Sequence, residues 1–295
     1  MSLMVILICL IAERFLLDHQ HLRQMRWLDR FSQWLAQQDS AAWMRQGIMR
    51  VVTLLLPPLL LAGIAQQLFA NTMFGLLGVI FAGLVLLYTL GPDDLDSQID
   101  AYTRAVEDGD DESIKEIARE IIGDEPPTSE PALSQAVAEG TLFQANQRIF
   151  AVLFWFLLLG PMGALLYRLS TRLPQLEYAN RDLDFYLNAK QLVVILDWLP
   201  ARVTAVCYAI AGSFEDALYG WRSFQGRRFD EFSDSNSGTL ICTGGGAMRL
   251  NTLLDESNEA LQDYSHLPQS AMALIWRSLV VFLVIIAVLT FTGIF

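Results

Sequence analysis

Cysteine and histidine are scarce in this chain, and neither occurs at the spacing of a ligand set. The few that exist are scattered: Cys9, Cys207, Cys242, His19, His21 and His266. A disulfide framework needs pairs of cysteines, and a zinc site needs Cys or His at short, regular intervals. The sequence therefore argues against a disulfide scaffold, and we expect no metal site.

Basic residues are also few. The chain has 20 Lys and Arg against 32 Asp and Glu, which gives a formal net charge of −12. Binding of nucleic acid depends on clustered basic side chains that neutralise phosphates, so no nucleic-acid partner is expected. The glycine run Gly244–Gly246 lacks the following Gly-Lys-Ser/Thr of a phosphate-binding loop, which excludes that motif. Sustained strand-like alternation is missing too, and an all-α fold is predicted.

Long apolar runs are what the chain has in abundance, since 53% of its residues are hydrophobic. We predict an all-α integral membrane protein forming a single domain over 1–295, with about four to five membrane helices and additional amphipathic cytoplasmic helices. The first run lacks the basic start and cleavage site of a signal peptide and is expected to stay in the mature protein. The membrane segments are expected at about 1–17, 48–69, 73–90, 149–167 and 272–294.

The polar stretches between these runs have distinct characters. Residues 18–46 interleave arginine with tryptophan, which is typical of a helix at the cytoplasmic membrane interface. Arg45 and Arg50 place the outer ends of the hairpin 48–90 in the cytoplasm. An acidic helical loop is expected over 91–145, with two short helices joined by the turn Asp108–Asp111. A helical polar segment is expected over 170–271, with a loop over Ser233–Thr243.

The run Ile149–Leu166 admits two interpretations. It is long enough to span a membrane, but Gly160-Pro161 breaks it, so it also fits two half-helices that line a cavity as a re-entrant element. The arginines that follow it favour the cytoplasm for its far end, where the acidic loop before it already lies. A single crossing cannot satisfy both assignments, and we favour the re-entrant form.

The stretch from Leu192 to Gly212 is apolar except for Asp197 and Arg202, which lie on either side of Pro200. Proline has no N–H and clashes with the preceding turn, so a kink or a new helix start is expected there. Charged groups at an apolar depth are candidates for function. The alternative is a structural Asp–Arg pair that fixes a corner between two helices.

Several short motifs carry a resemblance to a known family. The most specific is Asp197-x-x-Pro200-Ala201-Arg202, and the others precede it in order: Asn146, Phe154-Trp155, Gly160-Pro161, Gly163-Ala164 and Tyr167-Arg168. With these motifs the chain resembles the AmpE family, within the larger group of CobD/CbiB-like membrane proteins. The resemblance covers most of the chain, from Glu13-Arg14 to the last apolar run.

The resemblance implies a multi-pass protein of the bacterial inner membrane. AmpE proteins are regarded as modulators of β-lactamase induction linked to cell-wall turnover, whereas the CobD/CbiB relatives attach an aminopropanol-type side arm to a corrinoid. Our main expectation is a regulatory or sensory protein that is not an enzyme. The alternatives are a cobinamide-phosphate synthase-like, amide-forming ligase and a structural membrane partner. Expected partners are the lipid bilayer, a small anionic or muropeptide-related ligand and a second copy of the chain.

This chain departs from the cobalamin enzymes at two places where they carry acids. Arg148 and Phe150 follow Asn146 where an acid is expected, and Leu169-Ser170-Thr171-Arg172-Leu173 replaces an Asn-Thr-Leu-Asp stretch. Metal-nucleotide binding needs such carboxylates, so no cofactor is expected here, although the resemblance implies ATP and Mg²⁺. The remaining polar residues suit an anionic ligand, and we predict this binding set: Asn146, Arg148, Tyr167, Arg168, Asp197, Arg202, Asp124 and Glu139.

Overall fold

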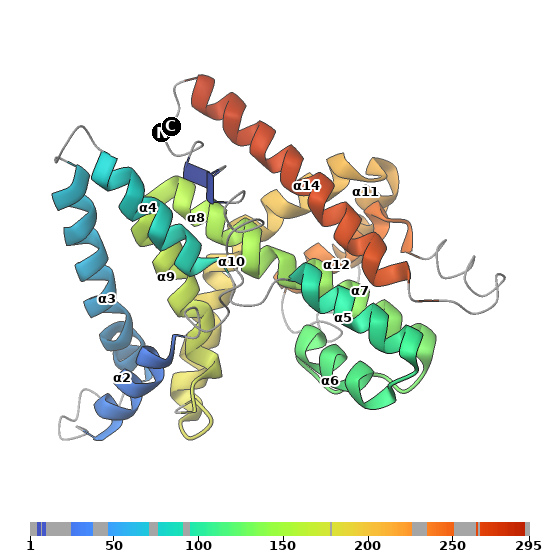
Figure 1. The fold of residues 1–295 in the computed structure, drawn as a ribbon, viewed down its shortest axis with the longest axis horizontal. Helices are drawn as coiled ribbons and strands as arrows, with labels where there is room; N and C mark the ends of the chain where they lie inside the picture. The colour runs from blue at the N-terminus through green and yellow to red at the C-terminus, as the bar shows by residue number, and fades with distance from the viewer. Residues whose placement is uncertain are drawn as a thin grey trace. The chain divides into compact units, whose positions relative to one another are not determined.

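The protein is α-helical in every range that the computed structural model describes. These ranges are residues 5–6, 8–9, 25–37, 47–70, 76–90, 95–177, 179–225, 235–250, 264 and 266–292, and they contain no strand. The all-α prediction is confirmed. The chain divides into two compact units, drawn in Figure 1. Unit 1 comprises Met1–Pro92, Ala151–Asp197 and Phe295, and unit 2 comprises Asp93–Phe150 and Trp198–Ile294.

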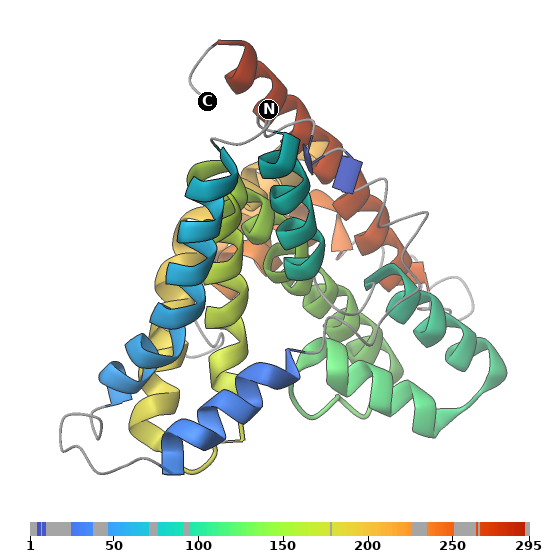
Figure 2. The same ribbon diagram turned by 60° about the vertical axis from the view of Figure 1, so that its left-hand side comes forward.

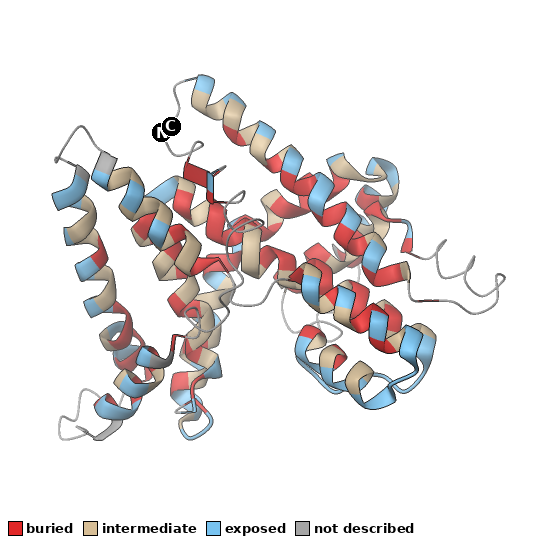
Figure 3. Cartoon of the chain, in the orientation of Figure 1, coloured by how far each residue is buried: buried red, intermediate tan, exposed pale blue. Residues whose placement is uncertain are grey.

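Four described helices are long and apolar enough to cross a membrane, which supports the expected multi-pass membrane protein. They are Gly47–Phe69, Glu130–Leu159, Leu183–Ala211 and His266–Phe291, and the shorter Leu77–Thr89 is apolar as well. In the apolar stretch of Gly47–Phe69, only 28% is buried within the protein. Figure 3 shows exposed and intermediate residues along most of this helix. Such an apolar, exposed surface is what a lipid bilayer would cover.

Two of these four helices differ from the sequence expectation. Leu183–Ala211 was expected inside a polar segment, and Glu130–Leu159 was divided between an acidic loop and the next apolar run. In both cases a polar helical turn continues directly into an apolar one, so one helix carries both kinds of sequence. The expected segment 1–17 lies almost wholly outside the described residues.

Unit 1 is built from α2 (Arg26–Gln37), α3 (Gly47–Ala70), α4 (Leu76–Thr89), α8 (Ala151–Leu159) and α9 (Pro161–Arg172), followed by the short 3₁₀ turn η5 (Leu173–Gln175). The first half of α10 (Leu183–Ala211) completes it. Helices α3 and α4 pack on each other, and both contact α9. The apolar pair α3–α4 agrees with the predicted hairpin.

The run Ile149–Leu166 does not form one straight helix. Helix α8 ends at Leu159, Gly160 adopts a positive φ of 68°, and Pro161 opens α9 at its first position. The two helices pack on each other so closely that a Cβ on Gly163 would meet the backbone of Trp155. The break at Gly160-Pro161 therefore reverses the chain into a helical hairpin. This is the two-half-helix form that the sequence left open.

Helix α2 is amphipathic, and its inner face belongs to the core of unit 1. Leu28 and Leu35 are buried together with Val51 and Leu54 of α3 and Leu173 of η5. Their spacing of seven residues places both leucines on one side of the helix. Tertiary packing of this face thus holds a helix that is polar on average.

Unit 2 contains α5 (Leu95–Asp108), α6 (Asp111–Ile122), α7 (Glu130–Ala145), the π-helical turn η4 (Asn146–Phe150), the second half of α10, α11 (Phe214–Gln225), α12 (Ser235–Ala247) and α14 (His266–Phe291). Helix α7 is central, because it packs against α6, α12 and α14. The expected pair of short helices with an acidic turn is confirmed. Asp110 accepts hydrogen bonds from the N–H groups of Glu112 and Ser113 and so caps α6.

Helix α12 lies where a loop was expected over Ser233–Thr243, and this expectation was wrong from Ser235 onward. Serine, asparagine and glycine favour turns in isolation, but tertiary contacts override that preference here. The small residues allow α12 and α11 to approach until their backbones touch. A Cβ on Gly246 would meet the Asp216 carbonyl, and one on Gly220 would meet the Cys242 carbonyl.

Candidate functional site

Helix α10 carries the Asp-x-x-Pro-Ala-Arg motif and runs without interruption through Pro200. The new helix start that was one of the two expectations for this proline is therefore not present. Because Pro200 has no N–H, the carbonyl of Leu196 four residues earlier loses its helical donor. The indole Nε1–H of Trp155 on α8 donates to this carbonyl at 3.2 Å. A side chain from a neighbouring helix thus replaces the hydrogen bond that proline removes.

Asp197 and Tyr167 form a buried polar pair in unit 1. The Tyr167 hydroxyl donates to Asp197 Oδ1 at 2.5 Å, and the two residues are 0% and 3% exposed. A buried carboxylate is stable only when hydrogen bonds compensate for its lost hydration. The contact joins α9 to α10 and brings together two of the residues predicted for the site.

Asn146 lies in the π-helical turn η4, where α7 passes into α8. It is fully buried, and its Oδ1 accepts a hydrogen bond from the Thr204 hydroxyl of α10 at 2.9 Å. Single π turns inside α-helices occur frequently at functional sites, because the extra residue turns side chains out of the regular register. Here that turn directs the predicted Asn146 toward the second half of α10.

Arg148 belongs to the same π turn but has different neighbours. Its Nε donates to Gln144 at 3.2 Å, and its Nη1 donates to Gln98 of α5 at 2.9 Å. Both of these partners are neutral amide groups of unit 2.

Three contacts within unit 2 hold the side chain of Arg202. Its Nη1 donates to the Trp198 carbonyl at 2.6 Å and to Asn236 Oδ1 of α12 at 3.0 Å. Its guanidinium carbon also lies 4.3 Å from the centre of the Trp198 ring, which is cation–π geometry. These contacts fix the plane of the guanidinium while using one of its two terminal nitrogens. A fixed arginine fork suits a carboxylate or phosphate.

The other predicted residues lie apart from these contacts in different ways. Asp124 is exposed in the turn after α6 and accepts a hydrogen bond from the N–H of Glu125. Glu139 is half-buried on α7 and accepts from Gln135 at 2.8 Å. Arg168 is half-buried on α9, next to Tyr167 in the chain.

Sequence reasoning missed two residues that bind predicted site residues, namely Thr204 and Asn236. Thr204 is 1% exposed and follows Arg202 by two residues, so its place in the apolar stretch was a usable signal. Asn236 is also 1% exposed, but it fell in the segment expected to be a loop. Only the packing of α12 shows that Asn236 contacts Arg202.

A magnesium-bound nucleotide, which the resemblance implies, is usually held by one or two protein carboxylates together with its own phosphates. Within the described ranges, no three His, Cys, Asp or Glu side chains gather in a way that could hold a metal ion. The buried carboxylate Asp197 accepts a hydrogen bond from Tyr167. A metal bound at the described residues would therefore take most of its ligands from the nucleotide and from water.

Fold and site together define a class: an all-α, multi-pass membrane protein with buried polar groups on its apolar helices. Comparison with known proteins makes the class specific. The CobD/CbiB protein family matches residues 6–259. The chain therefore belongs to the CobD/CbiB family, whose matched range includes all eight predicted site residues.

Curated relatives carry the name cobalamin biosynthesis protein CobD. The protein of Chromobacterium violaceum is 32% identical over 197 residues, which are 64% of this chain and 61% of the relative. That of Stutzerimonas stutzeri is 32% identical over 139 residues, 46% of this chain and 45% of the relative. The chain thus matches about half to three fifths of the length of these relatives. No solved structure matches it.

Proposed function

We propose that this protein is a membrane enzyme related to cobinamide-phosphate synthase, which joins an aminopropanol-type amine to a corrinoid carboxyl group as an amide. The family match over 6–259 carries the proposal, because it spans the whole polar set of α7 to α10. The relatives named cobalamin biosynthesis protein CobD support it further. These findings favour the ligase over the regulator that the sequence analysis put first.

In this proposal Arg202 binds the anionic end of a substrate. Its Nη1 is engaged by the Trp198 carbonyl and Asn236, so the guanidinium is oriented before any ligand arrives. Orientation in advance lowers the entropy lost on binding. Nε and Nη2 then serve as a second pair of donors for a carboxylate or phosphate. Asn146 accepts from Thr204, two residues after Arg202, and so helps to hold this part of α10 in place.

The direct test is formation of the amide by the purified full-length protein in detergent. The reaction mixture contains a corrinoid acid, aminopropanol phosphate and Mg²⁺-ATP, and the product is separated by chromatography. We expect product with the wild type and a rate about 30-fold lower for Arg202→Gln, since losing one partner of a partly buried charged contact costs about 2 kcal/mol or more. Arg222→Gln, at an exposed arginine of α11, is the matched control. Absence of product with the wild type contradicts the ligase.

A second candidate is a regulator of the AmpE type in the bacterial inner membrane, modulating β-lactamase induction. One feature of the sequence favours it: Arg148 and the stretch Leu169–Leu173 lack the acids that the family resemblance implies for the cobalamin enzymes. The same arginine fork would then hold an anionic, muropeptide-related ligand, in one copy of the chain or in a homo-oligomer. Deletion of the gene separates the two candidates. A regulator changes β-lactamase induction and makes no amide, and Arg202→Gln reproduces the deletion.

A further inference from the structure

Helix α2 lies across one end of unit 1. Its buried leucines contact Val51 and Leu54 in the first turns of α3, and the same cluster includes Leu173, just after the end of α9, and Phe185, at the start of α10. The indole Nε1–H of Trp27 donates to the Tyr88 hydroxyl, near the end of α4, at 2.7 Å. Figure 2 shows this arrangement, with α2 in blue. Helix α2 thus crosses the place where apolar helices begin and end.

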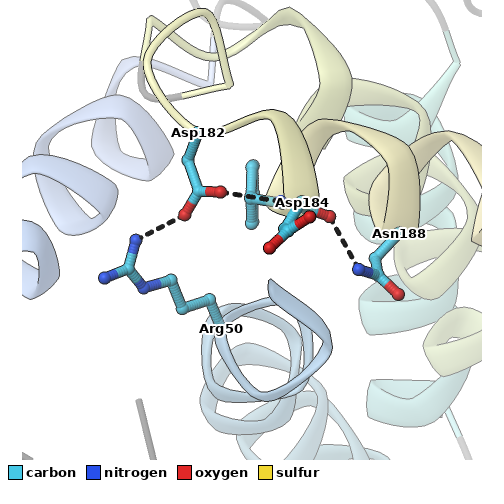
Figure 4. Close-up of polar contacts among 5 residues, drawn as sticks. Arg50, Asp182, Asp184 and Asn188 are labelled. Carbon is cyan, nitrogen blue, oxygen red and sulfur yellow. Dashed lines mark hydrogen bonds and ion pairs between the residues drawn. The ribbon is translucent and has the colours of Figure 1, made fainter. Parts of the chain in front are cut away.

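This end of unit 1 is held firmly by polar contacts. Arg50 of α3 donates to Asp182 at 2.7 Å, and Asp182 also accepts from the N–H of Phe185, which caps α10 (Figure 4). A Cβ on Gly47 would lie 2.6 Å from the Asp184 carbonyl carbon, so α3 and α10 touch here through their backbones. The start of α3 is therefore fixed to the start of α10, and α2 packs against both through its buried leucines.

The outward side of α2 is a stripe of aromatic side chains and one arginine: Trp27, Arg30, Phe31 and Trp34. Their spacing of three, four and seven residues places them on one face. Trp27 is 40% and Trp34 51% exposed, and Arg30 is exposed. Phe31 is half-buried against the core of unit 1 and stacks on Trp34 with ring centres 6.0 Å apart. Two indoles so exposed, at the level where apolar helices end, are typical of the headgroup region of a bilayer.

Charge on this stripe has the opposite sign to the chain as a whole. The stripe contains Arg30 and no acid. Asp29 beside it is half-exposed, and the exposed Glu177 accepts a hydrogen bond from Gln33 of α2 at 3.4 Å. The sequence adds Arg23 and Arg26, whereas the chain carries a net charge of −12. A locally basic, aromatic helix face complements an anionic lipid surface.

We propose that the outward face of α2, formed by Trp27, Arg30 and Trp34, binds the headgroups of anionic phospholipids. The two indoles lie among the glycerol and upper acyl segments, Phe31 supports Trp34 from the protein side, and Arg30 pairs with lipid phosphate. This role is independent of the reaction or signal proposed above, because none of these residues belongs to the predicted ligand-binding set.

The test uses the full-length protein in phosphatidylcholine bicelles, titrated with phosphatidylglycerol brominated near the top of its acyl chains. Bromine quenches nearby tryptophan, and the difference between wild type and Trp34→Phe isolates the emission of Trp34. We expect this emission to be quenched at a lower lipid fraction by brominated phosphatidylglycerol than by brominated phosphatidylcholine. Arg30→Gln should raise the half-quenching fraction about fivefold, the equivalent of about 1 kcal/mol for one basic group at an anionic surface.

Arg222→Gln, which removes an exposed arginine from α11, is the matched control and should leave the half-quenching fraction unchanged. Equal quenching by the two brominated lipids would show that headgroup charge is not recognised and would overturn the proposal. So would emission from Trp34 that neither lipid quenches but aqueous acrylamide does, because this face would then meet water or another protein. Melting temperatures of both variants confirm that the fold is retained.

Discussion

The α11–α12 pair of unit 2 and the polar helix contacts of unit 1 are held together by opposite means, although close glycine contacts also occur in unit 1 at Gly47 and Gly163. In unit 2, α11 and α12 meet because side chains are missing, with Gly220 and Gly246 set against facing carbonyls. In unit 1, helix ends and a broken helical ladder are joined by particular polar side chains. Arg50 pairs with Asp182, and Trp155 donates to the Leu196 carbonyl. The first kind of contact is disrupted by any added side-chain volume. The second is disrupted by the loss of a single hydrogen-bond donor or acceptor.

This difference has a consequence for tolerance to substitution. A backbone-to-backbone contact has no soft atom that can move, so even one methyl group must push two helices apart. A polar contact can lose its hydrogen bond without a change in the spacing of the helices. Its loss therefore lowers the free energy of unfolding by less than a backbone clash does. We therefore expect the largest effects in close glycine contacts such as those between α11 and α12, and smaller ones in the polar contacts of unit 1.

The largest effect is expected from Gly246→Ala. The new Cβ would collide with the Asp216 carbonyl and the backbone of Ala217, and we expect a loss of about 3 kcal/mol in the free energy of unfolding. Gly245→Ala on the same helix is the control, since its Cβ would lie 3.6 Å from Leu250, an ordinary contact. This control should be neutral or slightly stabilising. Thermal or denaturant unfolding in detergent measures both, and equal losses would contradict the steric account.

A smaller effect is expected from Trp155→Phe, which removes the donor to the Leu196 carbonyl. The carbonyl is left without its replacement partner, at a cost of about 1–2 kcal/mol. In a Pro200→Ala background the N–H of residue 200 can donate to the same carbonyl. The cost of Trp155→Phe in that background should then fall by about 1 kcal/mol. A double-mutant cycle from unfolding measurements gives this coupling, and strict additivity would show that the indole contributes by packing alone.

The smallest effect is expected from Asp182→Asn, about 1 kcal/mol at neutral pH. Burial opposes ionisation of Asp182, but hydrogen bonds from the Phe185 N–H and from Arg50 outweigh it and hold the pKa of this carboxyl below its ordinary value. Its folded pKa lies below its unfolded pKa, so the ionised group stabilises the fold above the unfolded pKa of about 3.9. That stabilisation is lost as the pH falls through the folded pKa.

Unfolding measured from pH 7 down to the acid limit tests this linkage. The difference in stability between wild type and Asp182→Asn should shrink as the wild-type carboxyl becomes protonated. Asp184→Asn, two residues later and exposed, serves as the control and should show a smaller difference. A difference that stays constant with pH would mean that the contact with Arg50 does not depend on the charge of Asp182.

Much of the architecture was predictable because apolar runs and helical periodicity are local properties of the chain. The α3–α4 pair, the acidic turn capped by Asp110 and the break at Gly160-Pro161 all follow from residues within a few positions of each other. Helix α12 was not predictable in this way, because its Ser, Asn and Gly residues favour turns until α11 and α7 pack against them.

For the site, the sequence alone identified Asp197 and Arg202, because isolated charges in an apolar run are visible without any structure. Asn146 and Tyr167 were named through the family resemblance. The sequence also determined the all-α class and the motifs of the family. Their partners were decided only by the tertiary structure. Tyr167 meets Asp197 across thirty residues, and Arg202 meets Asn236 across thirty-four. Contacts of that range depend on which helix faces pack together, and helix packing is a property of the whole fold.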